Sequence, residues 1–179
     1  MATTKVFFEV LLSISRSELK TVFPAVLDTQ PVDSMLATQY WSGGAYHLGA
    51  HQAVKMTVKS CTEHENTPKK KDPDFLRADL EQAIQDDLCF TFYVQLQVDP
   101  KKTPIENAAV RWDPKVSPEL PVADVYLRNQ DFANNERDDF CDSLSFNPWH
   151  GISAHQPMGH INRARRHVYD ASRNHRGGS

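Results

Sequence analysis

The sequence contains no long hydrophobic run. No stretch approaches the ~18 consecutive apolar residues that a membrane-spanning helix needs, so we expect no membrane span. The N-terminal residues MATTKVFFEVLL lack the basic start of a secretory signal, and the C-terminal Gly-Gly-Ser is not a peroxisomal address. These absences predict a cytoplasmic protein.

Cysteine is scarce and follows no metal-binding or disulfide-framework pattern. The chain has three cysteines, Cys61, Cys89 and Cys141, and none forms a C-x-x-C pair. An odd number without such spacing predicts free thiols in a reducing compartment.

The charge of the chain is unevenly distributed. The net charge is −3, but five arginines between Arg163 and Arg176 stand against Asp170 alone, which gives this segment +4 and leaves −7 for the remainder. An acidic body with a basic end argues against nucleic-acid binding, and it leaves room for a local acidic ligand.

Hydrophobic periodicity predicts strands interspersed with helices. The alternation of apolar and polar residues is clearest over 88–98, where Phe90, Phe92 and Val94 share one side. We expect a single α+β domain over residues 1–179 with an antiparallel sheet. The expected strands are 5–12, 53–59, 88–98, 108–112 and 122–127. The expected helices are 72–84, with Asp72 as its cap, 159–177, and 15–27, which Pro24 would otherwise divide into two short turns. The expected loops are 64–72 and 131–142.

The last predicted helix carries an unusual polar stripe. Arg165, Tyr169, Ser172 and Arg176 are spaced 4, 3 and 4 residues apart, which places them on one helical face. A tyrosine can ligate haem iron, although a phenol normally loses its proton only near pH ~10. Arg165, one turn before Tyr169, is within reach of the phenol oxygen, and its charge favours the ligating anion. Arg176 could pair with a haem propionate through its planar guanidinium.

These residues carry a resemblance to a known family. The segment RRHVYDASRNHRG (165–177) resembles the proximal haem signature of catalases, R-x-F-S-Y-x-D-T-x-R-H-R. Arg165, Tyr169, His175 and Arg176 match it, and Ser172 stands for its threonine. Ala171 and Asn174 depart from it, and His167 and Val168 replace its phenylalanine and serine. The upstream LSFNPWH (144–150), HQPMG (155–159) and INRAR (161–165) runs are similar to those of short catalase-like haem proteins.

The resemblance implies a fold and a cofactor. The fold would be part of a catalase-like antiparallel β-barrel with flanking helices and a C-terminal proximal haem helix. The cofactor would be haem b: Tyr169 would be the iron ligand, Arg165 and Tyr169 the catalytic residues, and Arg165, Tyr169, Ser172 and Arg176 the haem-binding set.

The family's distal histidine and asparagine have no counterpart in this sequence. Lys5 to Phe8 resembles the PVFF strand that follows them, so we expect the chain to lack the distal half of the haem pocket. The unpaired strand edges of a partial barrel predict homo-oligomers. We expect the other histidines considered to lie at the surface or behind the haem ligands. They are His47, His51, His150, His155 and His160.

Two functions are compatible with this sequence. The first is a haem oxidoreductase acting on hydrogen peroxide or on an organic (lipid) hydroperoxide, inactive alone if the distal half is missing. The alternative is a non-catalytic remnant of the fold, or an interaction module that uses the basic C-terminal helix.

Overall fold

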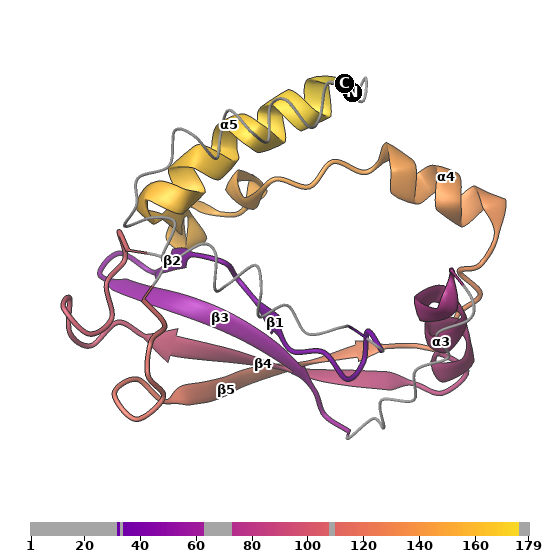
Figure 1. The fold of residues 1–179 in the computed structure, drawn as a ribbon, viewed down its shortest axis with the longest axis horizontal. Coiled ribbons are helices and arrows are strands. Elements are labelled where there is room, and N and C mark those ends of the chain that lie inside the picture. The colour runs from indigo at the N-terminus through magenta and orange to yellow at the C-terminus, as the bar shows by residue number, and fades with distance from the viewer. Residues whose placement is uncertain (1–31, 33, 63–72, 108–109, 176–179) are drawn as a thin grey trace. The chain divides into compact units, whose positions relative to one another are not determined.

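The computed structural model describes residues 32, 34–62, 73–107 and 110–175, and Figure 1 shows their arrangement. All of these residues lie within Val32–Ser179. The expected strand 5–12, the expected helix 15–27 and the expected loop 64–72 fall outside the described residues. The single domain over 1–179 stays a prediction.

A six-stranded antiparallel sheet forms the body of the described structure. Its strands follow the order β5-β4-β3-β2-β6, with β1 paired to β3. The predicted strands 53–59, 88–98 and 122–127 are confirmed as β3, β4 and β5, whereas Val110–Trp112 is not in a strand. The bounds are β1 Tyr40–Trp41, β2 Ala45–Leu48, β3 Gln52–Ser60, β4 Leu88–Leu96, β5 Glu119–Leu127 and β6 Pro157–Met158.

The register of β3 and β4 separates two faces of the sheet. On one face the opposite residues are Val54 and Leu96, Met56 and Val94, and Val58 and Phe92. On the other face they are Lys55 and Gln95, Thr57 and Tyr93, and Lys59 and Thr91. Because side chains alternate across a strand, these pairs place apolar residues on one face and mainly polar residues on the other.

The helix α3 (Phe75–Ala83) packs on the apolar face. A core cluster joins Leu36, Ile84, Leu88 and Phe90, with Leu80 and Ala83 of α3 packed against it. The predicted helix is therefore confirmed, but its N-cap is Asp74, which lies two residues later than the expected Asp72.

The prediction of a loop over 131–142 is wrong, because α4 spans Asn135–Ser143. The side chain of Asn134 caps this helix by accepting a hydrogen bond from the backbone N–H of Arg137, and Glu136 and Asp138 lie in its first turn. Both features stabilise a helix N-terminus. The helix buries no residue, so no apolar period marked it in the sequence.

The third described helix, α5, spans Gly159–His175 and confirms the predicted C-terminal helix as far as residue 175. Two short 3₁₀ turns precede it, η1 (Pro148–His150) and η2 (Ser153–His155). No helix in the described part of the chain is both long and apolar enough to cross a membrane.

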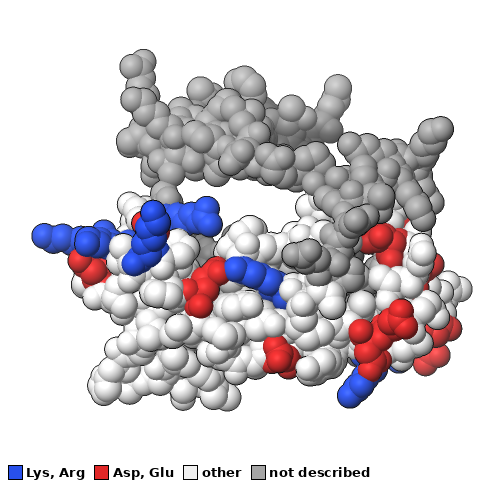
Figure 2. Space-filling model, turned by 90° about the horizontal axis from the view of Figure 1, so that it is seen from below, with Lys and Arg blue, Asp and Glu red and all other residues white. Residues whose placement is uncertain are grey.

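The sheet is open among the described residues, with β5 at one end of its path and β6 at the other. Leu120, Val122, Val125 and Tyr126 of β5 are about half exposed. The described part of the face in Figure 2 is mostly uncharged, and its basic side chains lie beside acidic ones. The predicted α+β class with an antiparallel sheet is confirmed, and closure into a barrel stays a prediction.

The prediction of three free thiols is wrong for two of them. Cys61 and Cys89 form a disulfide, with their Cα atoms 5.3 Å apart, and Cys141 is free and exposed. The pairing follows from the β3–β4 register: Ser60 lies opposite Phe90, so the next residue of one strand meets the preceding residue of the other. Disulfides are uncommon in reducing compartments, so the cysteine content no longer supports the cytoplasmic prediction.

Candidate functional site

The predicted stripe on α5 brings Arg165 and Tyr169 into direct contact. Nη2 of Arg165 donates a hydrogen bond to the Tyr169 hydroxyl at 3.2 Å, and the guanidinium carbon lies 5.5 Å from the centre of the phenol ring. Both side chains are partly buried. The expectation that an arginine one turn away reaches the phenol oxygen is confirmed.

Two further acceptors hold the other arm of the Arg165 guanidinium. Its Nη1 donates to the carbonyl of Ser42 and to Oδ1 of Asn162, each at 3.1 Å. Ser42 lies in the turn between β1 and β2, so the guanidinium links α5 to the sheet. A planar group with acceptors on both arms has little freedom to rotate, so it presents Nη2 to Tyr169 in a defined direction.

Asn162 anchors the start of α5 and is fully buried. Its Nδ2 donates to the carbonyls of Ala45 in β2, at 2.8 Å, and of Met158 in β6, at 2.9 Å. Sequence reasoning missed this residue. The available signal was an asparagine inside a helix, where it is a weak helix former and usually has another role.

The turn between β1 and β2 fits closely around Asn162. A Cβ atom added at Gly44 would lie 2.6 Å from Nδ2 of Asn162, and the positive φ of 68° at Gly43 favours glycine there. Backbone hydrogen bonds from His47 N–H to the Gln156 carbonyl and from Gly49 N–H to the Ala154 carbonyl tie β2 to the segment before α5. The position of Tyr169 thus depends on residues more than a hundred positions away.

The Arg165 pKa is raised above its ordinary value. Burial of the guanidinium acts to lower this pKa, but the hydrogen bond to Tyr169, the nearby Tyr46 and the charge interaction with Tyr169 together outweigh the burial. Arg165 is therefore a permanent cation beside the Tyr169 hydroxyl.

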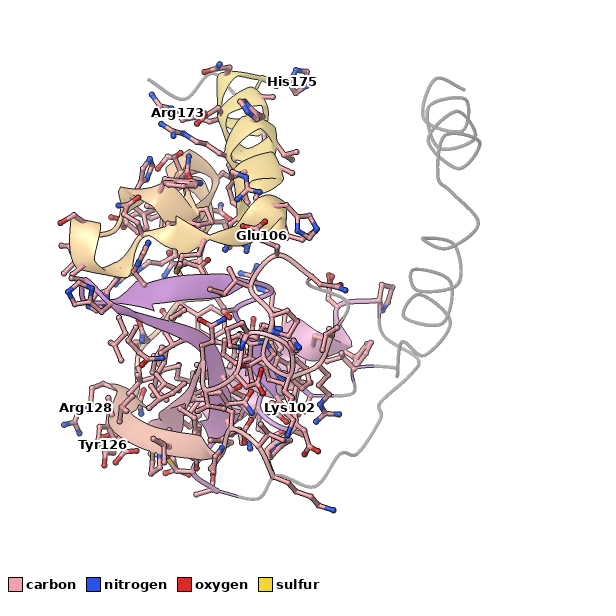
Figure 3. All side chains as sticks on the ribbon, turned by 90° about the vertical axis from the view of Figure 1, so that its left-hand side faces the viewer. Lys102, Glu106, Tyr126, Arg128, Arg173 and His175 are labelled. Atoms are coloured by element: carbon pink, nitrogen blue, oxygen red, sulfur yellow. A yellow bond between two sulfur atoms is a disulfide. The ribbon has the colours of Figure 1, made fainter. Side chains whose placement is uncertain are left out.

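Two other arginines of α5 have partners within the protein. Arg163 donates to both oxygens of Glu106, at 3.1 and 2.8 Å, and Arg166 lies over the Trp149 ring at 4.9 Å. Figure 3 shows Glu106 beside the start of α5, with Arg173 and His175 near its other end. The basic segment is therefore a set of specific contacts rather than a uniformly solvated face.

Arg173 differs from these arginines. Its Nε is buried and, among the described residues, has no hydrogen-bond partner. Because it is four residues after Tyr169, it lies on nearly the same face of α5. A buried cationic donor without an acceptor can accommodate an anionic oxygen.

The remaining predicted residues have different placements. Ser172 is exposed on α5, and Arg176 lies outside the described residues. Nδ1 of His155 lies 3.2 Å from the carbonyl oxygen of His47. Nδ1 of His160 lies 3.8 Å from Oε2 of Glu106. His51 and His150 are exposed, as expected for surface residues.

A cavity of about 250 Å³ lies elsewhere, between the end of α3 and the loop that precedes α4. Its lining includes Ile84, Asn129 and Phe132, and it shares no residue with the Arg165–Tyr169 pair. It is smaller than the ~300–1,000 Å³ of most small-molecule sites, and it holds no cluster of residues with an evident chemical role.

Comparison with known proteins identifies a related fold. No protein-family model matches the chain, and no curated protein matches its sequence. Among solved structures, a bacterial catalase matches with a TM-score of 0.61 and 17% sequence identity, over 82% of this chain and 31% of the catalase chain. The fold is similar to part of a catalase. The chain thus spans about a third of the length of that protein.

Proposed function

We propose that this chain is a catalase-like haem-binding protein in which Tyr169 ligates the iron of haem b. The hydrogen bond from Arg165 to the Tyr169 hydroxyl is the observation that carries the proposal, because it pairs a fixed cation with the side chain that must ligate as an anion. The similarity of fold to a bacterial catalase supports it.

The described residues fit the proximal side of a haem. Tyr169 would supply the iron ligand, and Arg165 would donate its hydrogen bond to the ligating phenol oxygen. The unpartnered Nε of Arg173 fits a carboxylate such as a haem propionate. We propose that Ser172 and Arg176 contribute to the same face. Bound haem would supply a ferric centre able to react with peroxides.

The residues of this chain would act by orientation and charge. Arg165, held by Ser42 and Asn162, would keep the Tyr169 oxygen directed at the metal and would stabilise its negative charge. The substrate class proposed is hydrogen peroxide or an organic (lipid) hydroperoxide. The proposal assigns the proximal side alone to this chain, and a proton-transferring group on the opposite side of the haem is a separate requirement of peroxide chemistry.

Two further properties belong to the proposal. Exposed apolar residues on β5, at the end of the described sheet, support association into homo-oligomers, because an unpaired strand edge can pair with another chain. The cytoplasmic location expected from the sequence stays a prediction, and the Cys61–Cys89 disulfide counts against it.

The second candidate function is a non-catalytic scaffold of the same fold. The observation that favours it is that Arg163, Arg165 and Arg166 all have partners within the protein. A helix stabilised in this way needs no cofactor to keep its shape.

Reconstitution with ferric haem distinguishes these functions. The chain should give a haem absorption spectrum that Tyr169→Phe changes, because phenylalanine keeps the ring and lacks the ligating oxygen. Tyr126→Phe, an exposed tyrosine on β5, is the matched control and should leave the spectrum unchanged. Identical spectra and haem affinities for wild type and Tyr169→Phe would exclude Tyr169 as the ligand.

A further inference from the structure

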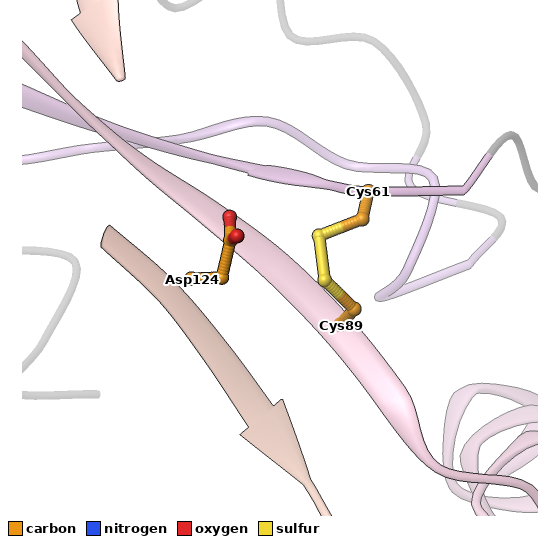
Figure 4. Close-up of side chains that lie close together, drawn as sticks. All are labelled: Cys61, Cys89 and Asp124. Carbon is orange, nitrogen blue, oxygen red and sulfur yellow. A yellow bond between two sulfur atoms is a disulfide. The ribbon is translucent and has the colours of Figure 1, made fainter. Parts of the chain in front are cut away.

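Three neighbouring strands bring two sulfur atoms and a carboxylate together on one face of the sheet. Cys61 follows β3 and donates its backbone N–H to the carbonyl of Cys89 in β4, at 3.0 Å. Asp124 in β5 lies opposite Thr91, two residues along β4 from Cys89. Figure 4 shows the disulfide between the first two strands, with Asp124 on the third.

The donor atoms of these residues are close enough to share one ion. The two Sγ atoms and a carboxylate oxygen of Asp124 all lie within 4.8 Å of one another. Thr91 lies between them: its Oγ1 donates to Oδ1 of Asp124 at 2.8 Å and is 3.3 Å from Sγ of Cys61. The cluster is therefore connected from one sulfur to the carboxylate.

The cluster is accessible, and the lysine opposite Thr91 is engaged elsewhere. Cys61 and Asp124 are exposed and Cys89 is partly buried. Lys59 lies opposite Thr91, but its ammonium pairs with Glu119 and lies 5.0 Å from the centre of the Tyr93 ring. The Asp124 carboxylate, which is hydrogen-bonded to the neutral hydroxyl of Thr91, is therefore available to bind a metal cation.

We propose that Cys61, Cys89 and Asp124 form a zinc site that is closed while the disulfide exists and opens when it is reduced. A dithiol reductant would break the S–S bond, giving two thiols on this chain and a disulfide in the reductant. Zn²⁺ would then displace both thiol protons to solvent and bind two thiolates and one carboxylate oxygen.

The chemistry of the donors selects the metal. Thiolates favour zinc over magnesium or calcium, and zinc accepts a mixed set of sulfur and carboxylate ligands. At Zn–S bonds of about 2.3 Å, tetrahedral geometry places two sulfurs about 3.8 Å apart. Cysteines opposite one another on paired strands, with Cα atoms 5.3 Å apart, can reach that separation by side-chain rotation once the disulfide is broken. A water would occupy the fourth position, and Thr91 would orient Asp124.

The full chain, reduced with a phosphine and separately kept oxidised, should be titrated with Zn²⁺ against a chromophoric chelator. The reduced chain should bind one Zn²⁺ and lose two reactive thiols, while the oxidised chain should bind none at this site. With Co²⁺ as a probe, the reduced chain should show a thiolate-to-metal charge-transfer band.

Variants separate this site from adventitious binding. Cys89→Ser should abolish zinc binding, and Asp124→Asn should weaken it at least about tenfold. Thr91→Val should weaken it about 10–100-fold, because it removes the hydrogen bond that orients Asp124. Cys141→Ser and Asp139→Asn, exposed residues outside the cluster, are matched controls and should bind as wild type does.

Four results would overturn the proposal. The first is equal zinc binding by oxidised and reduced chains, and the second is unchanged affinity in Asp124→Asn. The third is a reduced chain that keeps the circular dichroism of the oxidised chain yet binds no zinc. The proposal also fails if reduction unfolds the chain and zinc does not restore the circular dichroism, because the fold would then not exist with the disulfide broken.

Discussion

Nη2 of Arg165 and the hydroxyl of Tyr169 lie 3.2 Å apart across one turn of α5, with the arginine as donor. The helix alone allows this contact, since residues four apart are neighbours on its surface. The turn before β2 fixes the orientation of the Arg165 side chain, because the Ser42 carbonyl and Oδ1 of Asn162 accept hydrogen bonds from its Nη1.

Replacing Arg165 tests its proposed role beside the haem ligand. In Arg165→Leu the cation is lost, so ligation by Tyr169 should weaken and the ferric haem spectrum should change more between neutral and alkaline pH. The measurement is a spectroscopic pH titration of the haem-loaded chain. Arg163→Leu is the matched control: it removes a solvent-exposed ion pair with Glu106 and should leave the titration unchanged. If Arg165→Leu gave the same titration curve as wild type, Arg165 would have no role in ligation by Tyr169.

Gly44→Ala tests the link between the turn and the helix. The new Cβ would lie 2.6 Å from Nδ2 of Asn162, which is fully buried. Overpacking of this kind should lower the free energy of unfolding by about 1–3 kcal/mol. Because Asn162 also bonds Arg165, haem affinity should fall in the same variant. Denaturant unfolding and haem titration measure the two effects.

Gly151→Ala is the control for that experiment. A Cβ at Gly151 meets no atom within 4 Å, and its φ of −82° suits any residue. This variant should unfold as wild type does. Equal stability of Gly44→Ala and Gly151→Ala would show that the turn is not tightly packed on Asn162.

The sequence predicted those parts of the fold that depend on local periodicity. The long strands β3, β4 and β5 and the helix α5 alternate or repeat within their own residues, and all four were predicted. The helix α4 has no apolar face and depends on the Asn134 cap, so no period revealed it. β1, β2 and β6 are two to four residues long and exist through partners distant in sequence.

The site was predictable to the same extent. Helical spacing identified the Arg165–Tyr169 contact, because both residues belong to one helix. It did not identify Asn162 or Gly44 as supports, since their roles arise from a contact between α5 and a turn at the other end of the described chain. The Cys61–Cys89 pair was missed because its proximity depends on the register of two strands joined by a long connection.

Glu106→Gln tests the ion pair at the start of α5 through its pH dependence. The hydrogen bond from Arg163 lowers the pKa of Glu106, burial opposes this, and the charges of Arg163 and His160 add to the lowering. A carboxyl whose pKa is lower in the folded state stabilises the fold above its unfolded pKa. This contribution is lost as the pH falls through the folded pKa. Wild type should therefore unfold at a higher temperature than Glu106→Gln near neutral pH, and the two should converge in acid.

The control for this prediction is a double-mutant comparison. Arg163→Gln should mimic Glu106→Gln, and the two substitutions together should cost little more than either one, because each removes the same interaction. Because both side chains are exposed, added salt should reduce the difference between wild type and variant. A difference that persists unchanged in acid would contradict an ionic origin.

The last prediction concerns the activity of the haem-loaded chain. If Tyr169 and Arg165 provide only the proximal side, they favour cleavage of a bound peroxide without moving its proton. General acid–base catalysis at such a step typically contributes about 10²–10⁴-fold in rate. Peroxide turnover should therefore stay close to that of free haem, and an oxygen electrode measures this directly. Tyr169→Phe should leave that low rate nearly unchanged even though it alters the spectrum. Turnover at a rate typical of catalases would show that a residue of this chain transfers the proton, and His47, His51 and His150 would be the first to replace with glutamine.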